Sequence, residues 1–326
     1  MVFSKLFRVT DVQSPLLRTL LPSVCAAFAL QTAVAIPSIV SQSDRFYDLS
    51  GSITYVSVTA LSLYLPALRA RLAATAVGSA KAPIQSVLAT LTGASSTDGF
   101  NWRQIMLSTA VTLWATRLGT HLFQRIMADG HDSRFNEIRK SPSKFLGAFM
   151  AQATWVSLCL MPVLAINSIP NKLLSTLPKF KISDAVGIFL FIGGLGFEIV
   201  ADRQKSKWVK EKKEKKHDED FLSRGLWSKS RHPNYFGESM LWTGIATVST
   251  GVLVSRVGQL GMGLAGIRYG KILAIGMASV SPAFVTFLLL KVSGVPLSES
   301  KYDHKYGHRK DYQEWKRNTP MFIPKL

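Results

Sequence analysis

The sequence predicts an all-α fold, a polytopic membrane bundle of about seven transmembrane helices. Two observations predict it: the 326 residues are 47% hydrophobic with a positive mean hydropathy, and the chain nevertheless carries a formal net charge of +19. Apolar membrane helices that alternate with basic loops reconcile these two properties. Because the basic residues are interleaved with long apolar runs, and not gathered in one compact domain, we expect no nucleic acid among the partners.

Seven apolar windows approach the length of about 20 residues that a membrane-spanning helix needs. They lie near 19 to 39, 52 to 69, 104 to 125, 146 to 167, 184 to 203, 234 to 254 and 271 to 292. The first window could be a cleaved signal peptide, but its apolar run is longer than a usual signal core, so we expect a retained helix. Polar or charged residues flank the second and the fifth window. We expect residues 1–326 to form a single integral membrane domain.

The distribution of Lys and Arg predicts the orientation in the membrane. Seven spans put the termini on opposite sides, and the segments 125–144, 203–231 and 291–325, which share one side, hold about two dozen basic residues. We therefore expect a lumenal N-terminus, a basic cytosolic loop at 204–231 and a cytosolic C-terminal tail at 293–326. Residues 205–216 of this loop are expected to form a solvated cytosolic helix or to attach to anionic lipid, with a contribution to holding a phosphorylated ligand as the alternative. The segment 72–100 is expected to be a loosely ordered lumenal connector.

Polar side chains at the cytosolic ends of the fifth and sixth windows predict a binding site. Glu198 and Asp202 are four residues apart and therefore share one helical face, as do Asn234 and Glu238. Polar groups in or near hydrocarbon are expensive, so they are candidates for function. The four side chains can converge on one polar ligand, and the N-terminus of the sixth helix can bind an anion beside them.

Basic side chains extend this predicted site. Arg231 and His232 come directly before the sixth window. Arg117 lies inside the third window, where a charge costs ~2.5 to 3.5 kcal/mol even on the most lenient insertion scale. Arg117 should therefore face a cavity with a ligand, or pair with Glu198 or Asp202.

A set of motifs gives the chain a resemblance to a known family. The motifs are WATRLG at 114–119, GHDSRF at 130–135, EIVADRQ at 198–204, RHPNYFGE at 231–238, SGVP at 293–296 and TPMFIP at 319–324. From Asp44 onward the chain resembles the DUF1295 family, which is related to steroid 5-alpha-reductases and more distantly to Δ14- and Δ7-sterol reductases. The motif RHPNY alone is shared with membrane methyltransferases.

The resemblance implies NADPH-dependent reduction of a carbon–carbon double bond in a sterol-like or other hydrophobic lipid, in the endoplasmic reticulum membrane. In such relatives hydride passes from the nicotinamide to the β-carbon while an acid polarises the carbonyl. Carried over to this sequence, Glu198, Asp202, Asn234 and Glu238 match residues that contact NADPH in the relatives. The positions around Tyr302, Tyr306, Tyr312 and Arg317 fall where the relatives close over the nucleotide. With the neighbouring residues of the motifs added, the expected NADPH-binding residues are Glu198, Asp202, Arg231, His232, Asn234, Tyr235, Glu238, Arg117 and Tyr312. We expect no metal, because the pair His304 and His308 has no obvious third ligand.

The sequence departs from the steroid-reducing relatives at the substrate carbonyl. Those enzymes use a glutamate and a tyrosine from early helices, but the first glutamate of this chain is Glu137. The nearest substitutes, and our candidate catalytic residues, are Asp48, Tyr55 and Tyr64. Asp48 could instead be a helix-starting carboxylate near the lumenal surface. A 3-oxosteroid substrate is therefore not favoured.

Two other classes of function compete with the reductase. An S-adenosylmethionine-dependent methyltransferase of the isoprenylcysteine or phospholipid type would share RHPxY. Such enzymes usually carry adjacent glutamates in the C-terminal segment, whereas Glu299 stands alone between two serines here, which favours the reductase. A non-catalytic sterol-binding membrane protein is the third class.

Overall fold

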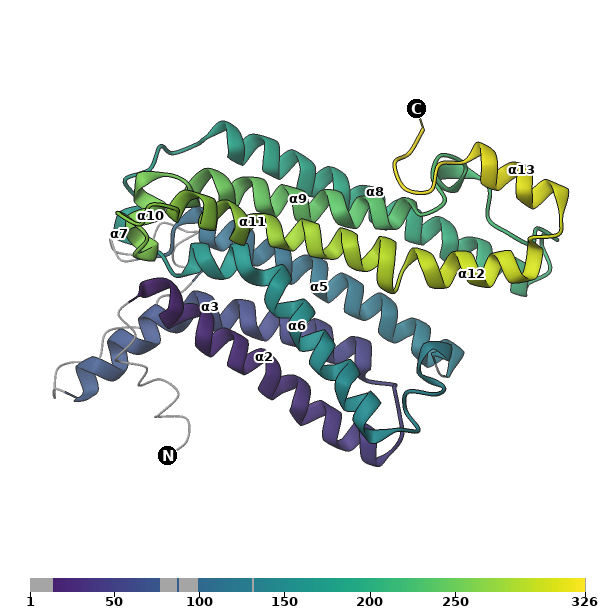
Figure 1. The fold of residues 1–326 in the computed structure, drawn as a ribbon, viewed down its shortest axis with the longest axis horizontal. Coiled ribbons are helices and arrows are strands. Elements are labelled where there is room, and N and C mark those ends of the chain that lie inside the picture. The colour runs from purple at the N-terminus through teal and green to yellow at the C-terminus, as the bar shows by residue number, and fades with distance from the viewer. Residues whose placement is uncertain (1–13, 77–86, 88–98, 131, 326) are drawn as a thin grey trace. The chain divides into compact units, whose positions relative to one another are not determined.

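The computed structural model describes residues 14–76, 87, 99–130 and 132–325, and their regular structure is helical throughout, as predicted (Figure 1). The chain divides into two compact units. Unit 1 comprises residues 1–181 and 249–278, and unit 2 comprises residues 182–248 and 279–326. Most of the segment 72–100, which we expected to be a loosely ordered connector, lies outside the described residues. The single membrane domain stays a prediction.

Unit 1 is built from four long helices and shorter pieces. They are α2 (Pro15–Val40), α3 (Tyr47–Ala76), α5 (Trp102–Asp129), α6 (Pro142–Asn167), α7 (Asn171–Leu174), α10 (Arg256–Met262) and the 3-10 turn η1 (Ser133–Phe135). Proline occupies the first turn of α2 and of α6, where its missing N–H costs nothing. Asn101 and Gln104 form a capping box at the start of α5. Helices α3 and α6 each pack against the other three long helices of this unit.

Unit 2 contains the sequence motifs at 198–204, 231–238, 293–296 and 319–324. Its elements are α8 (Ile182–Lys213), the 3-10 turn η2 (Gly225–Ser228), most of α9 (Pro233–Leu253), the second part of α11 (Gly270–Phe287), the π-helical η3 (Leu288–Val292), α12 (Val295–Tyr306) and α13 (Lys310–Asn318). Helix α8 continues ten residues beyond the predicted window of 184 to 203. The expected basic loop at 204–231 therefore begins as a helix.

Glycines bring α8 and α9 into backbone contact. A methyl group added to Gly237 would lie 2.7 Å from the carbonyl oxygen of Gly194 and 2.7 Å from the backbone nitrogen of Glu198. Seven residues away on both helices, a methyl group on Gly244 would lie 2.5 Å from the carbonyl oxygen of Gly187. Small residues of this kind allow close helix packing in membranes. The two helices are therefore antiparallel, and Glu198 lies at the level of Gly237.

Five helices of the described part are long and apolar enough to cross a membrane. They cover Pro15–Val40, Tyr47–Thr75, Pro142–Asn167, Ile182–Lys213 and Gly270–Tyr306. A sixth span is counted if Pro233–Leu253 and Arg256–Met262, which meet at an angle of 89°, are taken together. The predicted third window forms the 28-residue helix α5, but α5 is not among these apolar helices. The protein is thus a membrane protein with five or six such helices in the described residues.

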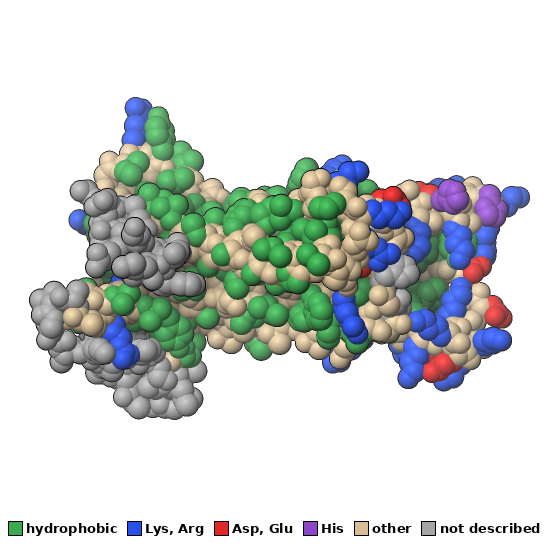
Figure 2. Space-filling view, turned by 90° about the horizontal axis from the view of Figure 1, so that it is seen from below, with side chains coloured by type: hydrophobic (Ala, Val, Ile, Leu, Met, Phe, Trp, Pro, Cys, Tyr) green, Lys and Arg blue, Asp and Glu red, His purple; other side chains and the backbone are tan. Residues whose placement is uncertain are grey.

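Charged side chains gather at one end of unit 2. Figure 2 shows Lys, Arg, Asp, Glu and His side chains over the end that carries α12 and α13, at the right of the view. The charged extension of α8 belongs to the same unit.

Candidate functional site

A pocket lies at the charged end of unit 2. Its volume, including the solvent-open entrance, is about 520 Å³. Aromatic side chains make up much of the pocket lining, together with a few charged side chains. The lining residues are Lys205, Trp208, Val209, Phe221, Leu222, Trp227, Arg231, His232, Ser298, Glu299, Tyr302, Tyr312 and Trp315. Apolar walls with a few polar groups are typical of sites for small molecules and cofactors.

The extension of α8 supplies one wall of the pocket. Beyond the apolar stretch, Lys207 and Glu211 form an ion pair of 3.7 Å at a spacing of four residues, which supports an exposed helix. Trp208 on this extension is buried, and its Nε1 donates a hydrogen bond of 2.7 Å to Glu219. The ring of His217 stacks on Trp208 with 5.2 Å between centroids. The segment after α8 therefore folds back on the helix and covers Trp208.

The turn η2 fixes the start of α9 relative to α8. The indole Nε1 of Trp227 donates a hydrogen bond of 3.0 Å to the carbonyl of Ala201. The backbone N–H of Leu226 donates to the Gln204 side-chain oxygen at 2.9 Å. Gly225 adopts a φ of +62°, and a methyl group there would lie 2.6 Å from that same oxygen, so the turn requires glycine. These contacts position the segment that carries Arg231 and His232.

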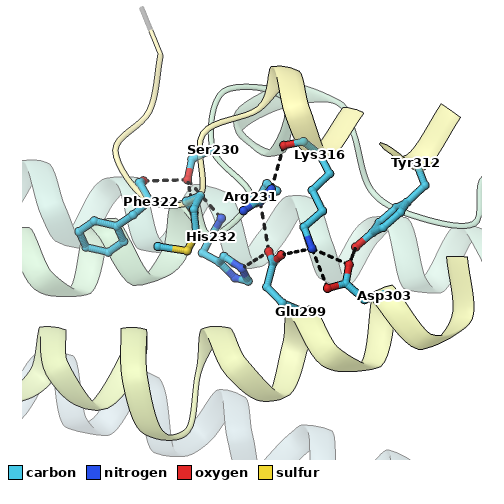
Figure 3. A network of polar contacts seen from close by, with 9 residues as sticks. Ser230, Arg231, His232, Glu299, Asp303, Tyr312, Lys316 and Phe322 are labelled. Atoms are coloured by element: carbon cyan, nitrogen blue, oxygen red, sulfur yellow. Dashed lines mark hydrogen bonds and ion pairs between the residues drawn. The ribbon is translucent and has the colours of Figure 1, made fainter. Parts of the chain in front are cut away.

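Three basic groups converge on the carboxylate of Glu299 (Figure 3). One oxygen of Glu299 lies 3.0 Å from His232 Nε2 and 3.1 Å from Arg231 Nε. The other oxygen lies 3.0 Å from Lys316 Nζ. Because Glu299 belongs to α12 and Lys316 to α13, this cluster joins both tail helices to the segment before α9.

The last residues of the chain return to the same segment. The backbone N–H of Arg231 donates to the carbonyl of Pro320 at 2.9 Å, and the Ser230 hydroxyl donates to the carbonyl of Phe322 at 2.8 Å. The backbone N–H of Lys325 donates to the carbonyl of Lys229 at 2.9 Å. The tail beyond α13 therefore holds the residues before α9 in place.

Tyr312 and Lys316 share the carboxylate of Asp303. The hydroxyl of Tyr312 donates to Asp303 at 2.9 Å, and Lys316 Nζ lies 2.5 Å from the same oxygen. Burial and the hydrogen bond to Asp303 raise the pKa of Tyr312 well above its usual value. Burial by itself lowers the pKa of Lys316, but the hydrogen bonds to Asp303 and Glu299 outweigh it and raise that pKa. At neutral pH the pocket-lining Tyr312 is therefore a neutral phenol, and the Lys316 beside the lining residue Glu299 is a charged ammonium group.

The predicted NADPH-binding residues fall into three groups. Arg231, His232 and Tyr312 line the pocket. Glu198 and Asp202 on α8, and Asn234, Tyr235 and Glu238 on α9, belong to unit 2 but are not among the lining residues. Arg117 is on α5 in unit 1, and its contact with the nucleotide stays a prediction.

The first turn of α9 lies between the pocket-lining His232 and the polar residues predicted on α8 and α9. The ring of Tyr235 stacks on His232, with 5.3 Å between centroids and 3° between planes. The side-chain oxygen of Asn234 is buried and has no hydrogen-bond partner among the described residues. Glu198 is 2% exposed and lies beside Gly237. Asn234 is thus a buried acceptor two residues after the pocket-lining His232.

The three candidate catalytic residues do not gather in one place. Asp48, Tyr55 and Tyr64 all belong to α3, whose rise of about 1.5 Å per residue puts the first and the last roughly 24 Å apart along the axis. Tyr55 is buried, with Trp114 and Trp155 edge-on at 5.1 Å each. The structure therefore does not place these three residues in a single site.

Asp48 belongs to a cluster of ion pairs in unit 1. Its carboxylate lies 3.5 Å from Arg134 and 3.7 Å from Arg125, and Arg134 also contacts Asp132 at 2.6 Å. The beginning of α3 is therefore on the same side as the segment after α5, which the charge count assigns to the cytosol. A lumenal Asp48 does not agree with the expected topology, in which the loops after the first and the third span share the cytosolic side; both the topology and the side of Asp48 stay predictions.

Several pocket residues were missed by the sequence analysis. Glu299 was considered only as evidence against a methyltransferase, and Trp208 and Trp315 were not considered at all. Tyr302 and Tyr312, which the resemblance places near the nucleotide, line the pocket, whereas Tyr306 and Arg317 are not among the lining residues. Glu299 lies three residues before Tyr302, so their shared helical face was a usable signal. No group of three or more His, Cys, Asp or Glu side chains in the described part of the chain is placed to hold a metal ion.

The fold and the site define the class as an all-helical integral membrane protein with a polar site at one end of a helical unit. Residues 69–319 match the family DUF1295, whose description is a protein of unknown function. The chain belongs to this family, which confirms that part of the resemblance. No curated protein and no solved structure matches the chain.

Proposed function

We propose that this protein is a membrane-embedded, NADPH-dependent reductase of a carbon–carbon double bond in a sterol-like or other hydrophobic lipid, acting in the endoplasmic reticulum. The observation that carries the proposal is the pocket of unit 2, where aromatic rings accompany the cationic side chains of Lys205 and Arg231. A flat base stacks on aromatic rings, and cationic groups bind phosphates. The resemblance to steroid 5-alpha-reductases supplies the reaction.

Buried polar atoms without partners support a polar ligand here. The indole Nε1 of Trp315, in the pocket lining, and the side-chain oxygen of Asn234 are both buried without a hydrogen-bond partner among the described residues. Leaving such a group unsatisfied costs about 1–3 kcal/mol. A nucleotide offers both donors and acceptors, so these residues fit NADPH, which when bound supplies the hydride. Arg231 and Lys205 would hold its phosphates, and Asn234 would orient a polar group near α9.

The proposal includes a seven-span topology with a lumenal N-terminus and a cytosolic C-terminus. Helix α5 is the added span: at 28 residues it is long enough to cross a bilayer. Its packing against α3 is consistent with membrane insertion, because a partly polar helix is tolerated where neighbouring helices cover it.

Tyr55 remains the proposed hydroxyl group at the lipid substrate. Among the three catalytic candidates, Asp48 is held by arginines, whereas Tyr55 and Tyr64 both pack edge-on against aromatic rings. Tyr55 lies within the apolar part of α3, where a hydrophobic substrate would be found.

One observation favours an S-adenosylmethionine-dependent methyltransferase as the second candidate. The carboxylate of Glu299 lies in an aromatic-lined pocket, and such surroundings suit a cationic sulfonium group. The charge of Glu299 is already compensated by Arg231 and Lys316, however. The surplus of basic groups therefore favours the anionic NADPH.

Cofactor binding by the detergent-solubilised protein tests the proposal. NADPH and S-adenosylmethionine are compared by calorimetry in wild type and in the variants Asn234→Ala, Glu238→Ala and Thr243→Ala. We expect NADPH to bind, and the first two variants to weaken it about tenfold, the equivalent of one lost hydrogen bond to a charged or buried group. Thr243→Ala, on an exposed position of the same helix, should leave binding unchanged.

Two outcomes would overturn the reductase. Tight S-adenosylmethionine binding that is lost in Asn234→Ala and Glu238→Ala would establish the methyltransferase. Binding of a sterol with neither cofactor would establish a non-catalytic sterol-binding protein.

A further inference from the structure

The cluster around Glu299 has the composition of an anion-binding site. Arg231, His232 and Lys316 surround the carboxylate at 3.0 to 3.1 Å, and their side chains are only 12%, 6% and 30% exposed. Cationic and imidazole donors that converge on one point bind phosphate groups as well as carboxylates. In this cluster the anion is a side chain of the protein itself (Figure 3).

The carboxylate of Glu299 fills this site incompletely. Arg231 Nε lies 3.1 Å from Glu299, but its buried N–H has no acceptor in hydrogen-bond geometry among the described residues. Another guanidinium nitrogen of Arg231 donates to the carbonyl of Lys316 at 2.8 Å. A carboxylate has two oxygens for three basic groups, and one oxygen faces both Arg231 and His232. A phosphate group, with more oxygens, could give each group its own acceptor.

The site opens to the pocket and its surroundings carry a surplus of positive charge. Arg231, His232 and Glu299 are all lining residues, and Lys205 lines the pocket from α8, with its Nζ 5.0 Å from the centre of the Trp227 ring. The lining residues come from the extension of α8, the segment before α9, α12 and α13, and Figure 2 shows charged side chains over the end that carries α12 and α13. A ligand that enters there comes from the aqueous side, not from the hydrocarbon.

We propose that Arg231, His232 and Lys316 form a binding site for the phosphate or pyrophosphate group of a soluble ligand, and that the carboxylate of Glu299 fills this site until the ligand displaces it. The proposal deepens the proposed function and rests on it only for the identity of the natural ligand as NADPH. Glu299 is then a residue that sets the affinity for the ligand by competing with its phosphate.

Inorganic pyrophosphate binding to the full-length protein in detergent tests this proposal. Removing the competing charge with Glu299→Gln should tighten pyrophosphate binding by about tenfold or more, because like charges a few ångströms apart repel strongly in a partly buried site. Lys316→Gln should weaken it about fivefold. Asp303→Asn is the matched control: Asp303 also contacts Lys316 but does not line the pocket, so binding should change less than about threefold.

Equal or weaker pyrophosphate binding by a folded Glu299→Gln variant would overturn the proposal, because Glu299 would then be a structural partner only. If Glu299→Gln does not fold, Glu299→Asp serves instead. It keeps the charge but withdraws the carboxylate by one methylene, so it too should bind pyrophosphate more tightly than wild type, and weaker binding would contradict the proposal. Thermal unfolding of each variant, followed by tryptophan fluorescence, shows which variants are folded.

A second part of the experiment distinguishes a soluble phosphate ligand from a lipid headgroup. Short-chain phosphatidic acid replaces pyrophosphate in the same titration, and tighter binding of the lipid would overturn the assignment to a soluble ligand. The experiments also distinguish a failure of the anion site from a failure of the proposed reductase function. If NADPH does not bind but Glu299→Gln still tightens pyrophosphate binding, the reductase is wrong and the anion site stands. If NADPH binds and Glu299→Gln has no effect on pyrophosphate, only the anion site is wrong.

Discussion

At the scale of single residues, the pocket depends on a few side chains that arrive from distant parts of the chain. The spacing of Asn234 and Glu238 was visible in the sequence, because helical periodicity places residues four apart on one face. The role of Glu299 was not visible. Glu299 forms ion pairs with Arg231 before α9 and with Lys316 in α13. No local sequence pattern indicates that these three residues come together in the fold.

The hydroxyl of Tyr312 gives a prediction about stability. Tyr312→Phe removes the hydrogen bond to Asp303 and keeps the ring packing, so we expect a loss of about 0.5–1.5 kcal/mol in the free energy of unfolding. Tyr312→Leu also removes the ring contacts with Phe221 and Trp315, and should cost about 3 kcal/mol. Chemical or thermal unfolding in detergent measures both. Equal losses in the two variants would show that the hydroxyl, and not the ring, makes the main contribution.

The hydroxyl of Tyr55 gives a prediction about activity. Tyr55→Phe keeps the ring between Trp114 and Trp155, so the apparent unfolding temperature should change by less than a few degrees. If Tyr55 acts on the lipid substrate, turnover should fall by about a hundredfold, the size of a typical acid–base contribution, while NADPH affinity stays the same. Unchanged turnover of NADPH would remove Tyr55 from the site and leave the catalytic acid to another residue.

At the scale of elements, the sequence predicted the helices better than their ends or their partners. Long apolar runs fold into α2, α6 and α8 because a membrane requires every backbone hydrogen bond to be satisfied within the helix. One interpretation of residues 205–216 was a solvated helix, and α8 continues as a helix to Lys213. Ion pairs such as Lys207 with Glu211 and the burial of Trp208 favour the helix there. The pocket depends on the return of the following segment onto Trp208, which the lysines did not indicate.

The close packing of α8 and α9 gives a prediction at the same scale. Gly237→Ala would put a methyl group 2.7 Å from backbone atoms of α8, so we expect a loss of about 1–3 kcal/mol in stability. It should also weaken nucleotide binding, because Asn234 and Glu198 would be pushed apart. Gly196→Ala is the control, since the added methyl group meets nothing within 4 Å. It should be neutral or slightly stabilising, by up to about 1 kcal/mol through helix propensity.

At the scale of the whole molecule, the sequence established an all-helical membrane protein of the DUF1295 family. For the number of membrane spans, the length of helix α5 and its composition point to different answers. Helix α5 is long enough to cross a bilayer but carries Arg117, His121 and Arg125, so its composition alone does not mark it as a span. Its neighbours in unit 1, and not its own sequence, would make it stable in a membrane.

The topology can be tested in intact microsomes. With seven spans and a lumenal N-terminus, a tag after Leu326 should be accessible to protease or antibody from the cytosol. A tag at the N-terminus should be protected until the membrane is permeabilised. Protection of the C-terminal tag would mean either an even number of spans or the opposite orientation, and the state of the N-terminal tag separates these two.

Hydrogen–deuterium exchange of the detergent-solubilised protein, with and without NADPH, tests most directly whether the charged end of unit 2 is a nucleotide site. The account predicts that NADPH slows exchange in residues 225–238 and 298–318, which hold the pocket and the first turn of α9. Unchanged exchange in both segments at saturating NADPH, or slower exchange there with S-adenosylmethionine alone, would contradict it.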